Sequence, residues 1–232
     1  MVEAFWIEEV KTPEFLRIAA GKEIGHKIGD MVDEKTTKLI KDAGIYPVLH
    51  QFSKGLAASR SMGDFWLEAN GVYNPVNVKA GQFGMNGNPN LVSIKRVIAG
   101  LASCRIDSYY LLIMKIATKD EAHTPHVYFV DMFDFLDFTN YNSGPGQLML
   151  KEGAFYAEVE RLYAEGKYFP EPRLSIAEKV LRLYAKLEAG DIALTLERDK
   201  KRLAIAQLVN DYPGLTKQEI QMQKQKATYF LG

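Results

Sequence analysis

Two short runs decide the fold: Gly63-Asp64-Phe65-Trp66-Leu67-Glu68-Ala69 and Pro75-Val76-Asn77-Val78-Lys79. Both contain the aromatic and β-branched residues that favour strands. Between them stands Asn70-Gly71, which is typical of two-residue β-hairpin turns because such turns need residues that tolerate a positive φ. The sequence therefore predicts a β-hairpin in which Asp64 opens the first strand and Lys79 closes the second.

The segments on either side of this hairpin predict further helices and strands. An apolar stripe of helical period predicts a helix over about Lys22–Asp42, with Gly44 as its stop. After the hairpin we expect a Gly- and Asn-rich loop over 81–90, a helix over Leu91–Ala102, buried strands over Ser108–Ala117 and Val127–Met132, and a second loop over 139–146. The helices expected in the last third are Ala154–Glu165, Ile176–Ala189, Ala193–Asn210 and Lys217–Tyr229.

This order of elements predicts an α/β fold, with a central mixed β-sheet flanked by helices and a helical C-terminal region. We expect a core over residues 1–150 and a helical subdomain over residues 151–232, joined without a clear linker. A chain of 232 residues is long enough for one large domain with such an appendage.

Composition excludes several functional classes. Lys and Arg number 29 and Asp and Glu also number 29, so the chain lacks the strong positive charge of a protein that coats nucleic acid non-specifically. An enzyme that gathers its basic groups in one cleft is compatible with this balance. The single cysteine, Cys104, excludes an internal disulfide and a multi-cysteine zinc site. The sequence has no apolar run long enough for a membrane span and no basic N-terminal signal, so we expect a cytoplasmic protein without a membrane partner.

Asp64, Asn77 and Lys79 are the candidate catalytic residues. The hairpin turn brings Asp64 and Lys79 toward the same end, and Asn77 shares a face with Lys79 because the two are two residues apart on one strand. Phosphodiester hydrolysis needs a divalent cation on a carboxylate and a cationic side chain near the attacking water, and these residue types supply both needs. A solvated hairpin face often carries the same residue types, so spacing alone leaves both interpretations open.

The same residues resemble the catalytic core of PD-(D/E)xK type II restriction endonucleases. That superfamily places an Asp on one strand and a D-x-K or E-x-K tripeptide on the next, where this chain has Asp64 and Asn77-Val78-Lys79. The resemblance extends more loosely from about Gly21 to Phe155. It implies a site-specific endonuclease that cuts double-stranded DNA with Mg²⁺, with Asp64 and Asn77 as the metal ligands.

The chain departs from the family pattern at two places. Asn77 is neutral where the family has its second carboxylate, although some restriction enzymes of this superfamily carry Asn there. The number of metal ions at the site is therefore left open. The residues before Asp64 are Met62-Gly63, without the Pro that gives the family part of its name.

Further acids are candidates to support the metal or its water. Glu23, Asp30 and Glu34 are spaced i, i+7 and i+11, so they share one side of the first predicted helix, where the resemblance implies a supporting acid. A solvated helix face is the alternative for these three. Glu68 lies four residues after Asp64, and that even spacing places both side chains on one face of a strand.

Base recognition is expected from the two polar loops, because Asn and Gln pair bidentately with adenine. The first loop supplies Gln82, Asn86, Asn88 and Asn90, and the second supplies Asn140, Asn142, Ser143 and Gln147. Lys54 and Arg60 precede the hairpin and are candidates for phosphate contacts. Ordinary turn chemistry also enriches Asn and Gly, so a purely structural role for either loop stays open.

Two other functions fit the same residues. One is a structure-specific nuclease of repair or recombination, and the other is an inert DNA-binding module in which Asn77 marks a decayed site. For a restriction enzyme we expect a symmetric homodimer, because duplex DNA has two antiparallel strands and each chain carries one Asp64–Lys79 site. An apolar stripe from Ile176 to Leu187 is a candidate for the dimer contact or for intramolecular core.

Overall fold

A computed structural model describes residues 1–19, 24–44, 62–69, 71–82, 88–117, 122–167 and 173–211. The chain divides into two compact units, Met1–Tyr184 and Ala185–Gly232. The first unit holds both sheets and extends well past residue 150, where the sequence predicted a boundary. Among the described helices, none combines the length and hydrophobicity needed to cross a membrane.

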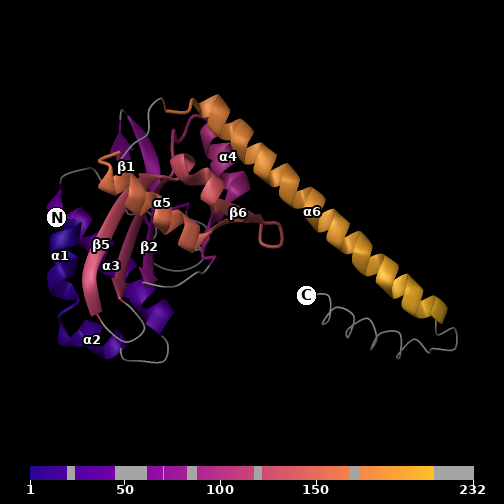
Figure 1. Ribbon diagram of the computed structural model, residues 1–232. Coiled ribbons are helices and arrows are strands. Elements are labelled where there is room, and N and C mark those ends of the chain that lie inside the picture. The colour runs from indigo at the N-terminus through magenta and orange to yellow at the C-terminus, as the bar shows by residue number, and fades with distance from the viewer. Residues whose placement is uncertain are drawn as a thin grey trace. The chain divides into compact units, whose positions relative to one another are not determined.

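The centre of the first unit is a four-stranded sheet of order β1-β2-β4-β5 (Figure 1). Its strands are β1 (Phe65–Ala69), β2 (Val72–Gln82), β4 (Tyr110–Ala117) and β5 (Ala122–Asp131). The β1–β2 and β4–β5 pairs are antiparallel and the β2–β4 pair is parallel. The predicted mixed central sheet is therefore confirmed.

The predicted hairpin is present, with Phe65 opposite Val76 and Ala69 opposite Val72. This register leaves only residues 70 and 71 for the turn, where Gly71 has a φ of +76°. Because the turn is so short, β2 begins at Val72, three residues before the predicted strand.

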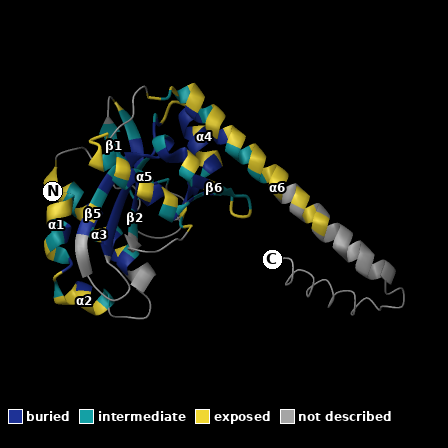
Figure 2. Ribbon diagram, viewed as in Figure 1, coloured by how far each residue is buried: buried dark blue, intermediate teal, exposed yellow. Residues whose placement is uncertain are grey.

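Three helices cover one face of the sheet: α1 (Val2–Glu9), α2 (Pro13–Ala19) and α3 (Ile24–Ala43). Their buried side chains form one apolar cluster with the sheet. Figure 2 colours the ribbon dark blue wherever a described residue is buried. The members of this cluster are Trp6, Val10, Phe15, Ile28, Met31, Val32, Phe65, Val76, Val78, Leu112, Met114 and Ile116. The sequence predicted α3, but α1 and α2 are too short to show a helical period.

The opposite face of the sheet packs against α5 (Glu152–Ala164). Lys115 on β4 forms an ion pair with Glu160 at 2.8 Å, and the Tyr128 and Tyr163 rings meet edge to face at 4.9 Å. Helix α4 (Ile94–Ala102) lies between the parallel strands β2 and β4 in sequence and buries its apolar side. The central sheet is thus flanked by helices, as predicted.

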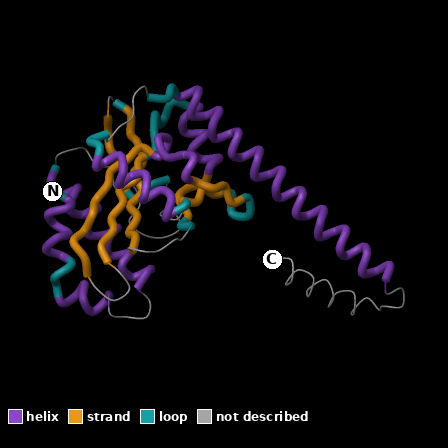
Figure 3. Tube along the Cα trace, viewed as in Figure 1, coloured by secondary structure: helices purple, strands orange, loops and turns teal. Residues whose placement is uncertain are grey.

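A second sheet of order β3-β7-β6 lies where the sequence predicted loops and part of a helix (Figure 3). Its strands are β3 (Asn90–Ser93), β6 (Thr139–Asn142) and β7 (Gln147–Leu150), and a 3-10 helix, η2 (Met132–Phe138), precedes β6. The predicted helix over Leu91–Ala102 was wrong for its first three residues, which belong to β3.

The last described helix, α6 (Ile176–Asp211), is continuous where two helices were predicted, and its course passes from the first unit into the second. In the first unit, Lys179 anchors its start. The Lys179 Nζ donates to the Asp107 carbonyl at 2.8 Å and to Ser108 Oγ at 3.1 Å, and lies 3.7 Å from Asp131. The predicted helix Lys217–Tyr229 lies outside the described residues.

Candidate active site

Asp64 lies at the edge of β2, immediately before β1. Its backbone N–H donates to the Val76 carbonyl at 2.8 Å, and its carboxylate Oδ2 accepts from the Val78 N–H at 2.6 Å. The backbone pairing between β1 and β2 ends near Val76, and the Asp64 side chain binds the next backbone N–H on the same edge of β2, that of Val78. One hydrogen bond from the Asp64 backbone and one to its carboxylate, both with β2, hold the residue in a defined position.

Gly63 explains how Asp64 comes so close to β2. A Cβ atom at residue 63 would lie 2.7 Å from the Val76 carbonyl oxygen and 2.9 Å from the Val76 nitrogen. Both atoms belong to the backbone of a central strand and cannot move aside cheaply. No residue with a side chain fits at this place, which gives a physical reason for glycine where the restriction-enzyme pattern has proline.

Asn77 and Lys79 lie on the face of β2 opposite the apolar cluster, since Val76 and Val78 belong to that cluster. Lys79 is half-buried, whereas Asn77 is only 7% exposed. The Asn77 Nδ2 donates to the Leu91 carbonyl at 3.2 Å and to the Tyr109 hydroxyl at 3.0 Å. A carbonyl can only accept, so the amide nitrogen must point toward Leu91 and Oδ1 must point away.

The Asn77 Oδ1 is buried and has no hydrogen-bond partner. A buried acceptor without a partner costs about 1–3 kcal/mol, so such an atom calls for an explanation. A bound metal ion coordinated by Oδ1 would supply such an explanation.

Asp33 is a member of this site that sequence reasoning missed. It lies on α3, and its Oδ1 accepts a hydrogen bond from Thr37 at 3.3 Å. Burial raises the pKa of Asp33 to about 6, with a further contribution from the negative charge of Asp64, while the positive charge of Lys79 opposes the shift. Asp33, Asp64 and Lys79 are therefore electrostatic neighbours. A signal was available: Asp33 directly follows the buried Val32, so it borders the apolar stripe of the helix.

Burial also raises the pKa of Asp64, against the charge of Lys79 and the Val78 N–H, which both lower it. Two carboxylates thus share a poorly solvated place with one ammonium group. Such an arrangement favours an additional cation, because a cation would stabilise both carboxylates in their charged form.

The other predicted acids lie elsewhere or at the margin. Asp30 and Glu34 are exposed, and the charge of Asp30 contributes only a small part of the pKa shift of Asp33. Glu68 is near the far end of β1. Its carboxylate accepts a hydrogen bond from the Tyr73 hydroxyl, and this bond raises the pKa of Tyr73. Glu23 lies outside the described residues. Within the described part of the chain, no group of three or more His, Cys, Asp or Glu is placed to hold a metal ion.

The candidate DNA-contacting residues fall into three groups. Asn88 is exposed just before β3. Five further candidates belong to the second sheet or to the turn between β6 and β7: Asn90, Asn140, Asn142, Ser143 and Gln147. Gln82 ends β2. Lys54, Arg60 and Asn86 lie outside the described residues. The structure thus joins residues from both predicted loops in one sheet.

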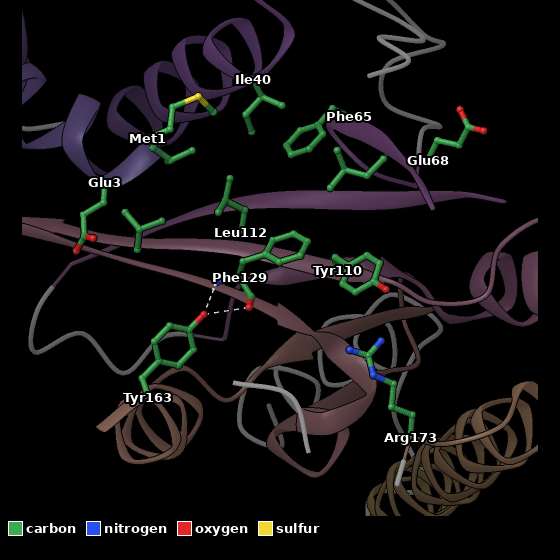
Figure 4. Close-up of a pocket in the computed structure, with 13 residues that line it drawn as sticks. Met1, Glu3, Ile40, Phe65, Glu68, Tyr110, Leu112, Phe129, Tyr163 and Arg173 are labelled. Carbon is green, nitrogen blue, oxygen red and sulfur yellow. Dashed lines mark hydrogen bonds between the residues drawn. The ribbon is translucent and has the colours of Figure 1, made fainter. Parts of the chain in front are cut away.

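A cavity of about 570 Å³ lies elsewhere in the first unit, between the start of α1, the end of α3 and the central sheet (Figure 4). It is lined mainly by apolar side chains, among them Phe65, Leu112 and Phe129. Asp33, Asp64, Asn77 and Lys79 are not among the residues that line it. This apolar cavity is therefore distinct from the candidate active site.

No protein-family model matches the chain, and the curated proteins give no significant match.

Proposed function

We propose that the chain is a Mg²⁺-dependent site-specific endonuclease of double-stranded DNA, of the PD-(D/E)xK type II restriction kind. The observation that carries the proposal is that Asp33, Asp64 and Lys79 are electrostatic neighbours at the start of β1, with the Asp64 carboxylate held by the Val78 N–H of β2. The order of α3, the β1–β2 hairpin, α4 and the buried strand β4 supports it, since the resemblance covers a helix, a hairpin, a following helix and a buried strand in that order.

The donor atoms at this edge suit Mg²⁺, which prefers carboxylate and carbonyl oxygens. Asp64 and Asp33 would supply carboxylates, and Asn77 would supply the Oδ1 that otherwise has no partner. Bound there, the ion would polarise a phosphate and lower the pKa of a coordinated water. With one neutral ligand, we expect an affinity that requires millimolar Mg²⁺.

Lys79 contributes the cationic group of the proposed site. Its positive charge lowers the pKa of Asp64 and opposes the rise in that of Asp33, so it keeps both carboxylates available as anions. An ammonium group at this place also favours the negative charge that develops on a phosphate during attack by water. We assign Lys79 to orienting the water and stabilising that charge.

We further propose that the working enzyme is a cytoplasmic homodimer, with one site for each DNA strand. Leu181 and Tyr184 on α6 are 68% and 52% exposed, and their spacing of three residues places them on one side of the helix. A twofold contact through this part of α6 would cover them.

Incubation with phage DNA tests the proposal against its two alternatives. Discrete Mg²⁺-dependent fragments from the wild-type protein, absent with Asp64→Asn, support a restriction enzyme. Smearing, or cleavage only at junctions and ends, supports a repair or recombination nuclease. The absence of cleavage over a range of Mg²⁺ and Mn²⁺ concentrations, with retained DNA binding, supports the inert binding module.

A further inference from the structure

The second sheet presents one face made almost entirely of uncharged polar side chains. Strand pairing places Asn90 and Asn140 on either side of Met149, and Ser93 and Asn142 on either side of Gln147. The intervening Leu148 and Leu150 are buried, so this set of six residues lies on the opposite, outer face. We call it the amide face.

The amide face is accessible and partly unsatisfied. Asn90 and Asn140 are exposed, and the other four residues are half-buried. Asn142 is occupied in holding the turn, because its Nδ2 donates to Met149 Sδ at 3.3 Å and its Oδ1 accepts from the Gly144 N–H at 3.2 Å. Gln147 Oε1, in contrast, is buried without a partner. Within the described parts of the chain, no hydrogen bond engages the side chains of Asn90 and Asn140.

The charge around this face favours a polyanion. The chain has 29 acidic residues, yet none lies between Glu68 and Asp107 or between Asp137 and Glu152. These two acid-free segments contain all three strands of the second sheet. Lys95 and Arg96, both exposed, follow β3 directly in the first turn of α4. Basic groups therefore adjoin the amide face. The three strands that form it carry no acidic side chain that would repel a phosphate.

We infer that the amide face enters the major groove of duplex DNA and reads adenine-containing base pairs; this rests on the proposed function. A small β-ribbon fits the major groove, where Asn and Gln pair with the N6 and N7 edge of adenine and an apolar group contacts the thymine methyl. Asn90 and Asn140 supply the exposed amides and Met149 the apolar group. The three strands carry no Arg or Lys, the residues that pair best with guanine.

One hydrogen bond joins this face to the candidate active site. Asn90 precedes Leu91, whose carbonyl accepts from the Asn77 amide at 3.2 Å. A base contact at the start of β3 therefore orders the same backbone that holds Asn77. Lys95 and Arg96 contact the phosphates that flank the base pairs.

Selection from a randomised duplex pool tests this inference, with Lys79→Ala protein in Ca²⁺ so that bound DNA is not cut. We expect the recovered sequences to share A·T pairs at fixed positions. Asn90→Ala and Asn140→Ala should each lose the preference at one position and weaken binding to the recovered site about tenfold. The control Lys11→Ala changes an exposed residue between α1 and α2 and should leave the preference unchanged.

Methylated probes give a second measurement. N6-methylation of adenine in the recovered site should weaken binding about tenfold or more, because it disturbs the edge that an amide reads, whereas 5-methylcytosine elsewhere in the duplex should have no effect. Selective binding that neither Asn variant alters, or binding without base preference by a protein that cuts DNA, overturns the amide-face assignment and leaves the nuclease standing. A protein that neither binds nor cuts DNA overturns both.

Discussion

Asp33 on α3 and Asp64 before β1 lie close enough that the negative charge of Asp64 adds to the burial that raises the pKa of Asp33 to about 6. A carboxyl group whose pKa is raised on folding favours the folded state most while it is protonated. Its contribution is complete below the unfolded pKa, near 4, and is lost as the pH rises through about 6. We therefore expect the Asp33 carboxylate to lower the stability of the protein at neutral pH when no cation is bound beside it.

The first prediction concerns the pH dependence of stability that the raised pKa of Asp33 produces. In the absence of divalent ions, the free energy of unfolding should fall as the pH rises from about 4 to above 6. Urea denaturation at several pH values measures this. Asp33→Asn should remove much of the slope, whereas Glu34→Gln, a change at an exposed neighbour, should keep it. Equal slopes for wild-type and Asp33→Asn would show that Asp33 does not titrate in this range.

The second prediction separates Asp64 from Lys79. Asp64→Ala should lose metal binding and reduce cleavage on the order of a hundredfold or more, while DNA binding in Ca²⁺ survives. Lys79→Ala should retain metal binding, followed by calorimetry, and lose cleavage to a similar degree. Cleavage by Asp64→Ala at the wild-type rate would place the active site elsewhere.

The third prediction concerns Asn77. Asn77→Ala should reduce the cleavage rate and raise the Mg²⁺ concentration needed for half-maximal activity, without preventing folding. Asn77→Asp restores the carboxylate of the family pattern but sets an acceptor against the Leu91 carbonyl, so it should bind Mg²⁺ more tightly while losing about 1–3 kcal/mol of stability.

Tyr109→Phe is the matched control for this change, because it removes the hydroxyl that also accepts from the Asn77 amide and leaves the ring. It should lower stability without tightening metal binding. A Mg²⁺ titration that is identical for wild-type, Asn77→Ala and Asn77→Asp would show that Asn77 does not face the metal.

The fourth prediction compares two glycine substitutions. Gly63→Ala should destabilise the protein and displace Asp64, because the new Cβ would meet the Val76 backbone at 2.7 Å. Gly29→Ala, in the interior of α3 with nothing within 4 Å of its Cβ, should stabilise it by about 0.5–1 kcal/mol. Thermal unfolding and cleavage assays on both variants check this. Full activity in Gly63→Ala would show that the position of Asp64 tolerates movement.

The fifth prediction addresses assembly. Light scattering with a short cognate duplex should give two chains for each duplex, and Leu181→Lys combined with Tyr184→Lys should reduce this to one. Arg182→Ala, an exposed polar neighbour on the same helix, serves as the control. A 1:1 complex that still makes double-strand breaks would replace the dimer with sequential nicking by a monomer.

The hairpin and α3 could be predicted because each has a strong local signal. Asn70-Gly71 fixes the turn, and the stripe containing Ile28 and Val32 fixes the buried side of the helix. The role of Asp33 could not be predicted in the same way. A helical period shows which residues share a face, but not which flank of the helix meets the edge of β2.

The second sheet was missed for another reason. Strands of four residues are too short to show an alternating pattern, and Asn140 and Asn142 resemble turn residues in sequence. Their strand conformation depends on pairing with β7, and β7 also pairs with β3, nearly sixty residues earlier in the chain. Such non-local pairing leaves no trace in a short window of sequence.

The closure of the β6–β7 hairpin has a consequence for protein engineering. Its outermost residues, Thr139 and Leu150, are paired with each other, so the twelve-residue segment begins and ends at one point of the fold. Within this segment Leu148 is buried and β7 also pairs with β3, so only the outward-facing positions of the hairpin can change without disturbing the neighbouring strand. Strand β3 offers no such freedom, because Leu91 holds Asn77. A library confined to the outer-face positions Asn140, Asn142 and Met149 would therefore leave the buried leucines and the Leu91–Asn77 hydrogen bond unchanged.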